Sequence, residues 1–331
     1  MKWKTLLSYR HCRSVGPWVR SQPAAEAALT LAAASAAASA GAQSRTTRTT
    51  RSSRPSALNS RLDSTFNFDR AGTITVNATS GDVVITGWSR DQVHVRAVSD
   101  DDNIRLDASG SRLTVEAANS RRSGETRFEL SVPYGVRVYT TSRSGDISVR
   151  GTRGQVEAHS QNGDVEVDDV MGRLDVNTVS GGVTTSSVSG DVEISTVNGD
   201  VRITDVRGNV NIGSVSGDIQ MRGVTASLVR VKTTSGDVVY DGVIDPAGRY
   251  EFNTHSGDIG LHIPREVSAQ LTISTWNGGI NSDFPITLKP GEHGIGLTST
   301  KRFSFQIGNG AARVTAETFS GDINIEKTGT P

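Results

Sequence analysis

"VSGDVEISTVNGDVRITDVRGNVNIGSVSGDI", residues 188–219, places a glycine at every ninth position. The spacing holds without interruption over nine glycines, from Gly145 to Gly217. Apolar residues follow each glycine at positions +2, +4 and +7, and the alternation of +2 with +4 is typical of a strand with one buried face. Glycine suits the turn between strands because it tolerates positive φ. Each nine-residue unit therefore predicts one short strand and one turn.

The residues around the glycines indicate how many units form one turn of the coil. At 18-residue intervals the pattern is [ST]-x-[SN]-G-[DG], whereas the glycines in between have mixed neighbours. Two kinds of edge thus alternate, and neighbouring units must stack to bury their apolar sides. We expect an all-β chain forming a flattened parallel β-solenoid (β-helix), with about 18 residues per turn. Stacked hydroxyl and amide side chains are expected to hydrogen-bond along the stack and fix its register.

Both ends of the repeat region depart from this regularity. The edge recurs at Gly236, Gly257, Gly278 and Gly321, at spacings of 19, 21, 21 and 43 residues, so the coil is expected to widen to about 21 residues per turn and to contain an insertion near 281–312. Before the regular region, "VHVRAV", "IRLDA", "RLTVEA" and "RFELSVP" predict four strands. We assign residues 63–140 to N-terminal coils with a strand cap and residues 141–331 to the β-solenoid.

The N-terminal residues predict export. A basic stretch precedes an apolar run that ends in Ala40-Gly41-Ala42, which is the small-x-small pattern of a signal-peptidase site, so residues 1–42 are expected to be a signal peptide cleaved between Ala42 and Gln43. Residues 43–62 are rich in Ser, Thr and Arg and predict a disordered linker. No further apolar stretch is long enough to predict a transmembrane segment in the mature chain. We expect a periplasmic, extracellular or cell-surface protein.

The charge distribution argues against nucleic acid as a partner. Residues 1–62 hold ten Lys or Arg residues and one acid, Glu26, and because the whole chain is neutral the remainder carries a net charge of −9. An acidic body is a poor binder of nucleic acid over most of its surface. The single cysteine, Cys12, precedes the predicted cleavage site, so the body has no disulfide.

Five segments together resemble a known bacterial family. They are "SGDVVITGW" (80–88), "LSVPYGVRV" (130–138), the run of [SN]-G-D-[VI] repeats, "TWNGGINSDFP" (275–285) and "IGNGAARVTAETFSGDINI" (307–325). Their order resembles the DUF4097 family of β-strand repeat proteins, also called the "putative adhesin" family, over about residues 65–326. This resemblance implies a β-solenoid, an envelope or surface location and, in some members, a link to envelope stress.

One edge of the predicted coil carries a column of aspartates: Asp146, Asp164, Asp200, Asp218, Asp237 and Asp258. Stacked carboxylates repel one another unless water screens them or cations bridge them, so calcium is a candidate ligand. Calcium-binding nonapeptide rolls use G-G-x-G-x-D, whereas this chain has one glycine before each Asp, and Gly182 and Gly279 interrupt the column. The alternative is that each Asp accepts hydrogen bonds from turn amides. We therefore predict no cofactor, with calcium as the alternative.

Aromatic residues offer a candidate binding surface. Two positions before the glycine, Val179, Val197 and Val215 are replaced by His255, Trp276 and Phe319 in the wider coils, and Trp88 lies near the other end. Either these side chains form a binding surface, or a wider coil needs bulkier filling.

Enzymatic motifs are not found in the sequence. The histidines show no H-E-x-x-H spacing and no G-x-S-x-G elbow occurs. The sequence favours a non-enzymatic, exported, adhesin-like or envelope-associated binding or scaffold protein, with an envelope polysaccharide or a surface protein as partner. The alternatives are a polysaccharide-active β-helical enzyme, which would show converging carboxylates in a cleft, and a calcium-stabilised structural spacer.

Overall fold

The computed structural model describes residues 60–99, 103–118, 126–285 and 301–328. This part of the chain contains no helix and 24 strands. The strands are β1 (Ser60–Asn67), β2 (Thr73–Ala78), β3 (Val83–Trp88), β4 (Gln92–Ser99), β5 (Asn103–Ala108), β6 (Arg112–Ala118), β7 (Thr126–Pro133), β8 (Arg137–Ser144), β9 (Ile147–Arg150), β10 (Val156–Asn162), β11 (Val165–Met171), β12 (Leu174–Ser180), β13 (Val183–Ser189), β14 (Val192–Asn198), β15 (Val201–Arg207), β16 (Val210–Ser216), β17 (Ile219–Ser235), β18 (Val238–Ser256), β19 (Ile259–Pro264), β20 (Ala269–Asn277), β21 (Ile280–Ser282), β22 (Lys301–Ile307), β23 (Ala312–Ser320) and β24 (Ile323–Thr328).

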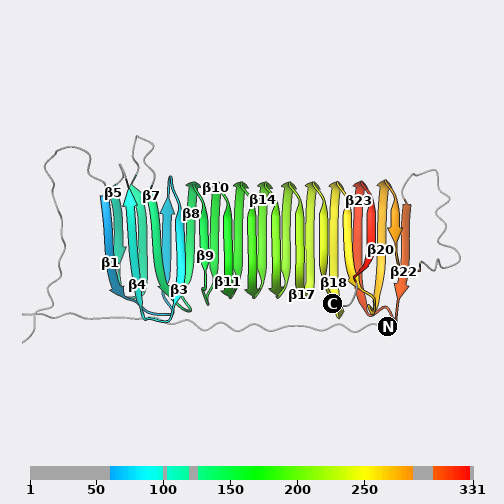
Figure 1. The fold of residues 1–331 in the computed structure, drawn as a ribbon, viewed down its shortest axis with the longest axis horizontal. Coiled ribbons are helices and arrows are strands. Elements are labelled where there is room, and N and C mark those ends of the chain that lie inside the picture. Colours follow the sequence, from blue (N-terminus) through cyan, green and yellow to red (C-terminus); the bar gives the residue numbers. More distant parts are fainter. Residues whose placement is uncertain (1–59, 100–102, 119–125, 286–300, 329–331) are drawn as a thin grey trace, which may run out of the picture. The chain divides into compact units, whose positions relative to one another are not determined.

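The strands form one large, mostly parallel sheet that turns back on itself, as in a solenoid (Figure 1). Even-numbered strands from β8 to β16 pair with one another, and odd-numbered strands from β9 to β15 do the same. In the regular region each partner lies 18 residues further along the chain, as Val156 pairs with Leu174. The long strands β17 and β18 continue both series. The prediction of an all-β, parallel, solenoid-like fold is confirmed.

The +2 and +4 residues of the repeat form the core between the two strand series. Val192 and Ile194 are 2% and 1% exposed, and the equivalent residues of neighbouring strands are buried in the same way. Because the side chains of a strand alternate between its faces, the +2 and +4 residues of every strand point into one continuous interior. In the wider coils, Tyr240, Tyr250 and Phe252 fill the additional interior space and pack against one another.

The repeated glycine has two structural causes. At Gly199, φ is 154°, a conformation that side-chain-bearing residues rarely adopt. A Cβ atom at Gly199 would also overlap the carbonyl oxygen of Gly181 in the preceding coil. The amide of Gly181 in turn donates to the carbonyl of Asn198 at 3.1 Å. The turn therefore stacks backbone directly on backbone, which only glycine permits.

The four strands predicted before the regular region are confirmed as β4, β5, β6 and β7. β6 and β7 run parallel to β2 and β3 and extend the solenoid by one coil. β5 is antiparallel to β6, β4 is antiparallel to β7, and β1 is antiparallel to β4. The parallel stack thus ends in antiparallel strands at its N-terminal side.

At the other end the order of the strands differs from the order of the chain. β23 pairs on one side with β18 and on the other with β20, and β24 lies in the same way between β19 and β21. In Figure 1 the red strand β23 accordingly stands between yellow and orange strands. β22 pairs antiparallel with β20 and follows it in the stack. The last repeat therefore inserts between two earlier ones instead of stacking on the end.

Of the predicted hydrogen bonds along the stack, the side-chain amide of Asn162 makes one in the regular coils, to the carbonyl of Arg143 at 3.3 Å. The hydroxyls three positions before the glycine make such bonds in the wider coils. There the hydroxyls of Thr254, Thr275 and Thr318 donate to glycine carbonyls of the neighbouring coil at 3.4, 3.0 and 3.1 Å. In the regular coils, the buried hydroxyls of Thr178, Thr196 and Ser214 have no hydrogen-bond partner within the described structure. For these residues the prediction is wrong, because the side chains of the regular coils face an apolar interior.

Candidate functional site

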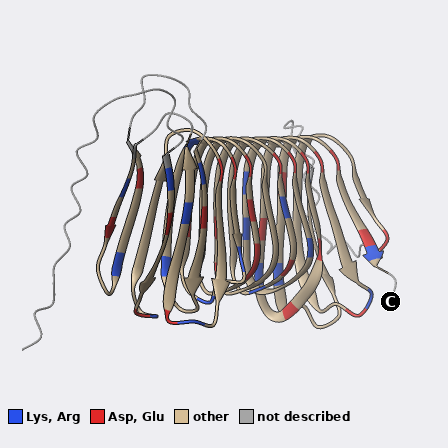
Figure 2. Cartoon of the chain, turned by 60° about the vertical axis from the view of Figure 1, so that its left-hand side comes forward, with Lys and Arg blue, Asp and Glu red and all other residues tan. Residues whose placement is uncertain are grey.

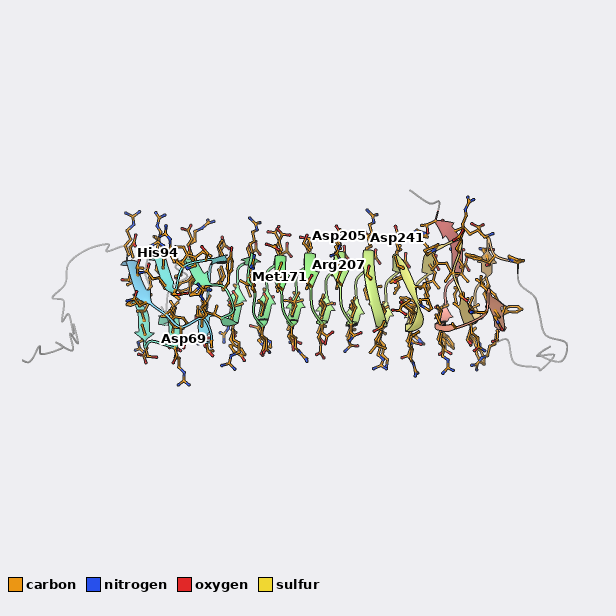
Figure 3. The ribbon with its side chains drawn as sticks, turned by 90° about the horizontal axis from the view of Figure 1, so that it is seen from below. Asp69, His94, Met171, Asp205, Arg207 and Asp241 are labelled. Atoms are coloured by element: carbon orange, nitrogen blue, oxygen red, sulfur yellow. The ribbon has the colours of Figure 1, made fainter. Side chains whose placement is uncertain are left out.

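The two kinds of turn expose different residues. In β11, β13 and β15 the residue six positions after the glycine has a left-handed backbone conformation. Its φ is 52° at Asp169, 55° at Ser187 and 54° at Asp205. Asp205 lies at the outer margin of the strands (Figure 3). The left-handed residue reverses the side-chain alternation, so that the following valines (Val170, Val188 and Val206) are buried.

The opposite turn keeps the strand alternation. In β12, β14 and β16 the residue at the same position is a buried Thr or Ser, such as Thr196, and the valine after it faces outward. Val179, Val197 and Val215 are consequently 46%, 40% and 47% exposed. The apolar character of these valines therefore has no role in the core, and their exposure follows from the geometry of this turn.

Pairing registers extend this position into a continuous column, which we call the outer stripe. In stacking order its exposed members are Val179, Val197, Val215, Thr234, His255, Phe319 and Trp276. Among the described residues, seven large hydrophobic side chains are exposed, and five of them belong to the outer stripe; the other two are Met171 and Val243. Exposed apolar side chains that gather at one repeat position mark an interaction surface more strongly than scattered ones.

Three aromatic rings form one end of the outer stripe. The ring centroids of His255 and Phe319 are 4.8 Å apart with an interplanar angle of 13°, and those of Trp276 and Phe319 are 5.9 Å apart at 15°. Trp276 and Phe319 are 38% and 44% exposed, and His255 is also exposed. The alternative that these residues fill a wider coil is therefore wrong.

The structure does not bring Trp88 to this surface. Trp88 ends β3, near the N-terminal side of the stack, and is half-buried. Its indole Nε1 donates to the carbonyl of Gln92 at 2.6 Å, and the guanidinium of Arg90 lies 5.1 Å from the ring centroid. These contacts hold the Trp88 side chain against residues of the turn that follows β3. The predicted cleavage site at Ala42 and Gln43 lies outside the described residues.

A trough of about 630 Å³ runs beside the valine part of the outer stripe. One wall is the column Arg143, Gln161, Val179 and Val197, and the floor is the buried column Ser142, Ser160, Thr178 and Thr196. The other wall is the column Thr141, His159, Asn177 and Ser195, which the strand registers place side by side. Ala78 and Thr79 also line the trough, which therefore crosses five successive strands of one series, β2, β8, β10, β12 and β14.

Carboxylates hold two side chains of the polar wall. The imidazole Nε2 of His159 lies 2.8 Å from Oε1 of Glu157, and the amide Nδ2 of Asn177 donates to Oδ1 of Asp175 at 2.8 Å. The sequence analysis missed this wall, although the 18-residue spacing of its members was a signal that could have revealed it.

The aspartates of the predicted column bind backbone instead of one another. Oδ1 of Asp164 accepts the amide hydrogen of Gly182 at 2.8 Å, Oδ1 of Asp200 accepts that of Asp218 at 3.1 Å, and the pattern continues through the wider coils. Within the described residues, no group of three or more His, Cys, Asp or Glu side chains is placed to hold a metal ion. The Asp column gives each turn an acceptor for an amide that the sheet does not use.

The carboxylate of Glu251 is part of an ion pair with two arginines. Its Oε2 accepts the Nε hydrogen of Arg230 at 3.0 Å, and Arg249 binds its other oxygen. The hydrogen bond from Arg230, with that from Arg249, lowers the pKa of Glu251 below its usual value. Glu251 therefore stays ionised at neutral pH, which does not suit the proton donor of a glycosidase.

The Toastrack DUF4097 family profile matches residues 71–326 of the chain. Among solved structures, a "putative adhesin" from Bacteroides fragilis is similar at 12% identity and a TM-score of 0.37, covering 80% of this chain and 97% of its own. A "putative adhesin" from Parabacteroides distasonis has the same identity and TM-score, covering 81% and 97%. A "putative lipid binding protein" from the latter organism is similar at 10% identity and a TM-score of 0.29, with coverage of 81% and 97%. No curated protein matches the chain. No described segment forms a helix of sufficient length and apolarity to cross a membrane.

Proposed function

The chain belongs to the Toastrack DUF4097 family, and from this premise we propose that it is an exported, non-enzymatic, adhesin-like protein that binds a component of the cell envelope through its outer stripe. The scaffold of this function is a flattened β-solenoid of about 18 residues per turn, widening to about 21, with an N-terminal strand cap. Such a scaffold repeats one surface position in every coil.

The observation that supports this function is the outward-facing column of apolar side chains. Val179, Val197 and Val215 contribute nothing to the core, yet each remains apolar, and the stacked rings of Phe319 and Trp276 continue the column. Exposing apolar groups to water has no folding advantage, whereas covering them in a complex removes apolar area from water. A column of equivalent groups also allows many weak contacts to act in parallel on a polymeric or crowded surface.

Export is supported by the sequence before the described residues. The apolar run that ends in Ala40-Gly41-Ala42 has the composition of a cleaved leader. An extracytoplasmic location would place the outer stripe opposite polysaccharides and surface proteins of the envelope.

The proposal is tested by co-sedimentation of the chain with purified bacterial cell envelopes. Phe319→Ser removes the ring that stacks on both His255 and Trp276, and it is expected to weaken binding by about tenfold. The control Val243→Ser removes an exposed valine outside the outer stripe and is expected to leave binding unchanged. Binding is expected to persist at high salt, since apolar contacts are not screened. Absence of saturable binding, or equal loss in both variants, would contradict the proposal; melting temperatures establish that both variants are folded.

A further inference from the structure

We propose that the trough between the polar column His159, Asn177, Ser195 and the column Gln161, Val179, Val197 binds an uncharged, linear polysaccharide chain along the axis of the stack. This inference rests on the proposed function, names the ligand class and extends the binding surface from Val179 and Val197 of the outer stripe to the neighbouring polar column.

One wall of the trough includes apolar side chains and the other is polar, and a sugar ring has both kinds of surface. The valines offer apolar contact, and the facing column offers the amide, hydroxyl and imidazole groups of Asn177, Ser195 and His159. A pyranose ring has apolar C–H surfaces and hydrogen-bonding hydroxyls at its rim, so both kinds of wall find a partner on the same ligand. Sites with mostly apolar contact and a few placed polar groups are typical of small-molecule recognition.

The walls repeat along the stack, which indicates a repeating ligand. Asn177 is paired with Ser195 and with His159 in the strand register, so equivalent groups recur at each strand spacing of about 4.8 Å. The five strands that line the trough span about 19 Å between the first and the last. A compact ligand would occupy one such unit, whereas a linear chain contacts all of them.

The charges around the trough disfavour an acidic polymer. Arg143 is the one permanently charged residue among those that line the trough. Behind the polar wall, the carboxylates of Glu157 and Asp175 hold His159 and Asn177. Elsewhere, Figure 2 shows acidic and basic residues interspersed along the strands. A uronate or phosphate chain would approach the carboxylates of Glu157 and Asp175, whereas a neutral chain meets no repulsion.

The polar wall is also preorganised. Because Asn177 already donates one amide hydrogen to Asp175, its side chain is oriented before a ligand arrives, with its oxygen and second hydrogen available. Ordering a side chain in advance reduces the entropy lost on binding. Repetition of such fixed groups suits a ligand that binds weakly per unit.

The inference is tested by isothermal titration of the full-length protein with three neutral hexasaccharides (cellohexaose, chitohexaose and maltohexaose) and with hexagalacturonate as the acidic counterpart. At least one neutral hexasaccharide is expected to bind, and hexagalacturonate is not. The double substitution Asn177→Ala with Ser195→Ala is expected to weaken binding by about tenfold, corresponding to the loss of one to two hydrogen bonds. The control Asn211→Ala changes an exposed asparagine of β16 outside the trough and is expected to bind as the wild type does.

Three results would overturn the inference: no neutral hexasaccharide binds, hexagalacturonate binds as tightly, or the double variant retains wild-type affinity. The failure of this inference is distinguishable from failure of the proposed function. If envelopes sediment the protein in a Phe319-dependent manner but none of the hexasaccharides binds, the trough is not a site for neutral polysaccharide. The outer stripe then remains supported as the envelope-binding surface. If envelopes do not bind the protein at all, the proposed function fails.

Discussion

Oδ1 of Asp146 accepts a hydrogen bond from the backbone amide of Asp164, 2.8 Å away and 18 residues along the chain. The same contact recurs from coil to coil along one edge, so that each carboxylate serves the turn of its neighbour. The sheet offers no backbone acceptor to the amide of this turn, so a carboxylate oxygen accepts its hydrogen. This contact explains why Asp follows glycine so regularly: it is a structural element of the turn.

The column is interrupted at Gly182, which can offer no acceptor to the amide of Asp200 in the next coil. Gly182 has no positive φ, and a Cβ atom there would lie 3.5 Å from the carbonyl oxygen of Asp200, an ordinary contact. Gly182→Asn is therefore expected to raise the free energy of unfolding by about 1 kcal/mol over Gly182→Ala, which shares the entropic effect but adds no acceptor. Urea denaturation measures the difference. Equal stability of the two variants would show that the acceptor has no energetic role.

The left-handed residue at Ser187 predicts a second stabilising change. Ser187 has φ of 55°, and in the wider coil Gly223 occupies the equivalent position. Ser187→Gly is expected to stabilise the protein by about 0.5–1 kcal/mol, because glycine relieves the strain of a Cβ atom at positive φ. Ser189→Gly, two residues away and without positive φ, is the matched control and is expected to destabilise. Thermal unfolding checks both; destabilisation by Ser187→Gly would contradict the turn geometry.

The unpaired hydroxyl of Thr196 predicts opposite effects for one substitution at two equivalent positions. Thr196→Val removes a buried hydroxyl that has no partner in the described structure and is expected to stabilise by about 1 kcal/mol. Thr318→Val removes a hydroxyl that donates to the carbonyl of Gly257 at 3.1 Å and is expected to destabilise by a similar amount. Chemical denaturation of the two variants decides; effects of the same sign would contradict the hydrogen-bond assignment.

Glu251 predicts a stability that depends on pH. Its pKa is lowered in the folded state, chiefly by the hydrogen bond from Arg230. The ion pair therefore stabilises the protein above the unfolded pKa of about 4.3, and this contribution is lost as the pH falls through the folded pKa. Glu251→Gln is expected to lower the melting temperature at neutral pH, and the difference from wild type is expected to shrink as the pH falls through the folded pKa.

The control for this effect is Glu166→Gln. The Glu166 carboxylate pairs with Arg150, but both side chains are half exposed, so its removal is expected to change the unfolding free energy by less than about 0.5 kcal/mol. A difference between wild type and Glu251→Gln that stays constant from neutral to acidic pH would contradict the ion-pair assignment.

The Asp column also predicts the response to calcium. Because Oδ1 of each aspartate is occupied by an amide hydrogen of the neighbouring coil, the column does not offer a ready set of cation ligands. Addition of chelator, or of millimolar calcium, is therefore expected to leave the melting temperature unchanged. A rise of several degrees on adding calcium would support the alternative of a calcium-stabilised spacer.

The sequence predicts the regular region well because one physical constraint repeats there. Every nine residues a backbone turn needs glycine, and the alternating valines and isoleucines, such as Val192 and Ile194, must face the core. It does not predict which +7 valine is buried, because Val197 and Val206 have the same spacing from their glycines. Val206 is buried because the residue before it, Asp205, has a left-handed backbone conformation. The presence of an aspartate does not by itself predict that conformation.

The order of the last coils could not be predicted for a related reason. The edges around Gly257, Gly278 and Gly321 share the same residue pattern, so any of them can stack on any other. The structure places Gly321 next to both Gly257 and Gly278. In that arrangement β22 returns antiparallel along β20, a pairing that no short motif encodes. His255, Phe319 and Trp276 therefore stack in that order, which differs from their order in the sequence.

The most direct test of the outer stripe as a binding surface is hydroxyl-radical footprinting of the wild-type protein, free and bound to purified envelopes. The exposed rings of Trp276 and Phe319 report on the outer stripe. Met171 (labelled in Figure 3) is also exposed, belongs to the other series of strands and is an internal reference. We predict that binding protects Trp276 and Phe319 from oxidation while Met171 reacts as before. Protection of Met171 without protection of the two rings would place the binding surface elsewhere and contradict the account.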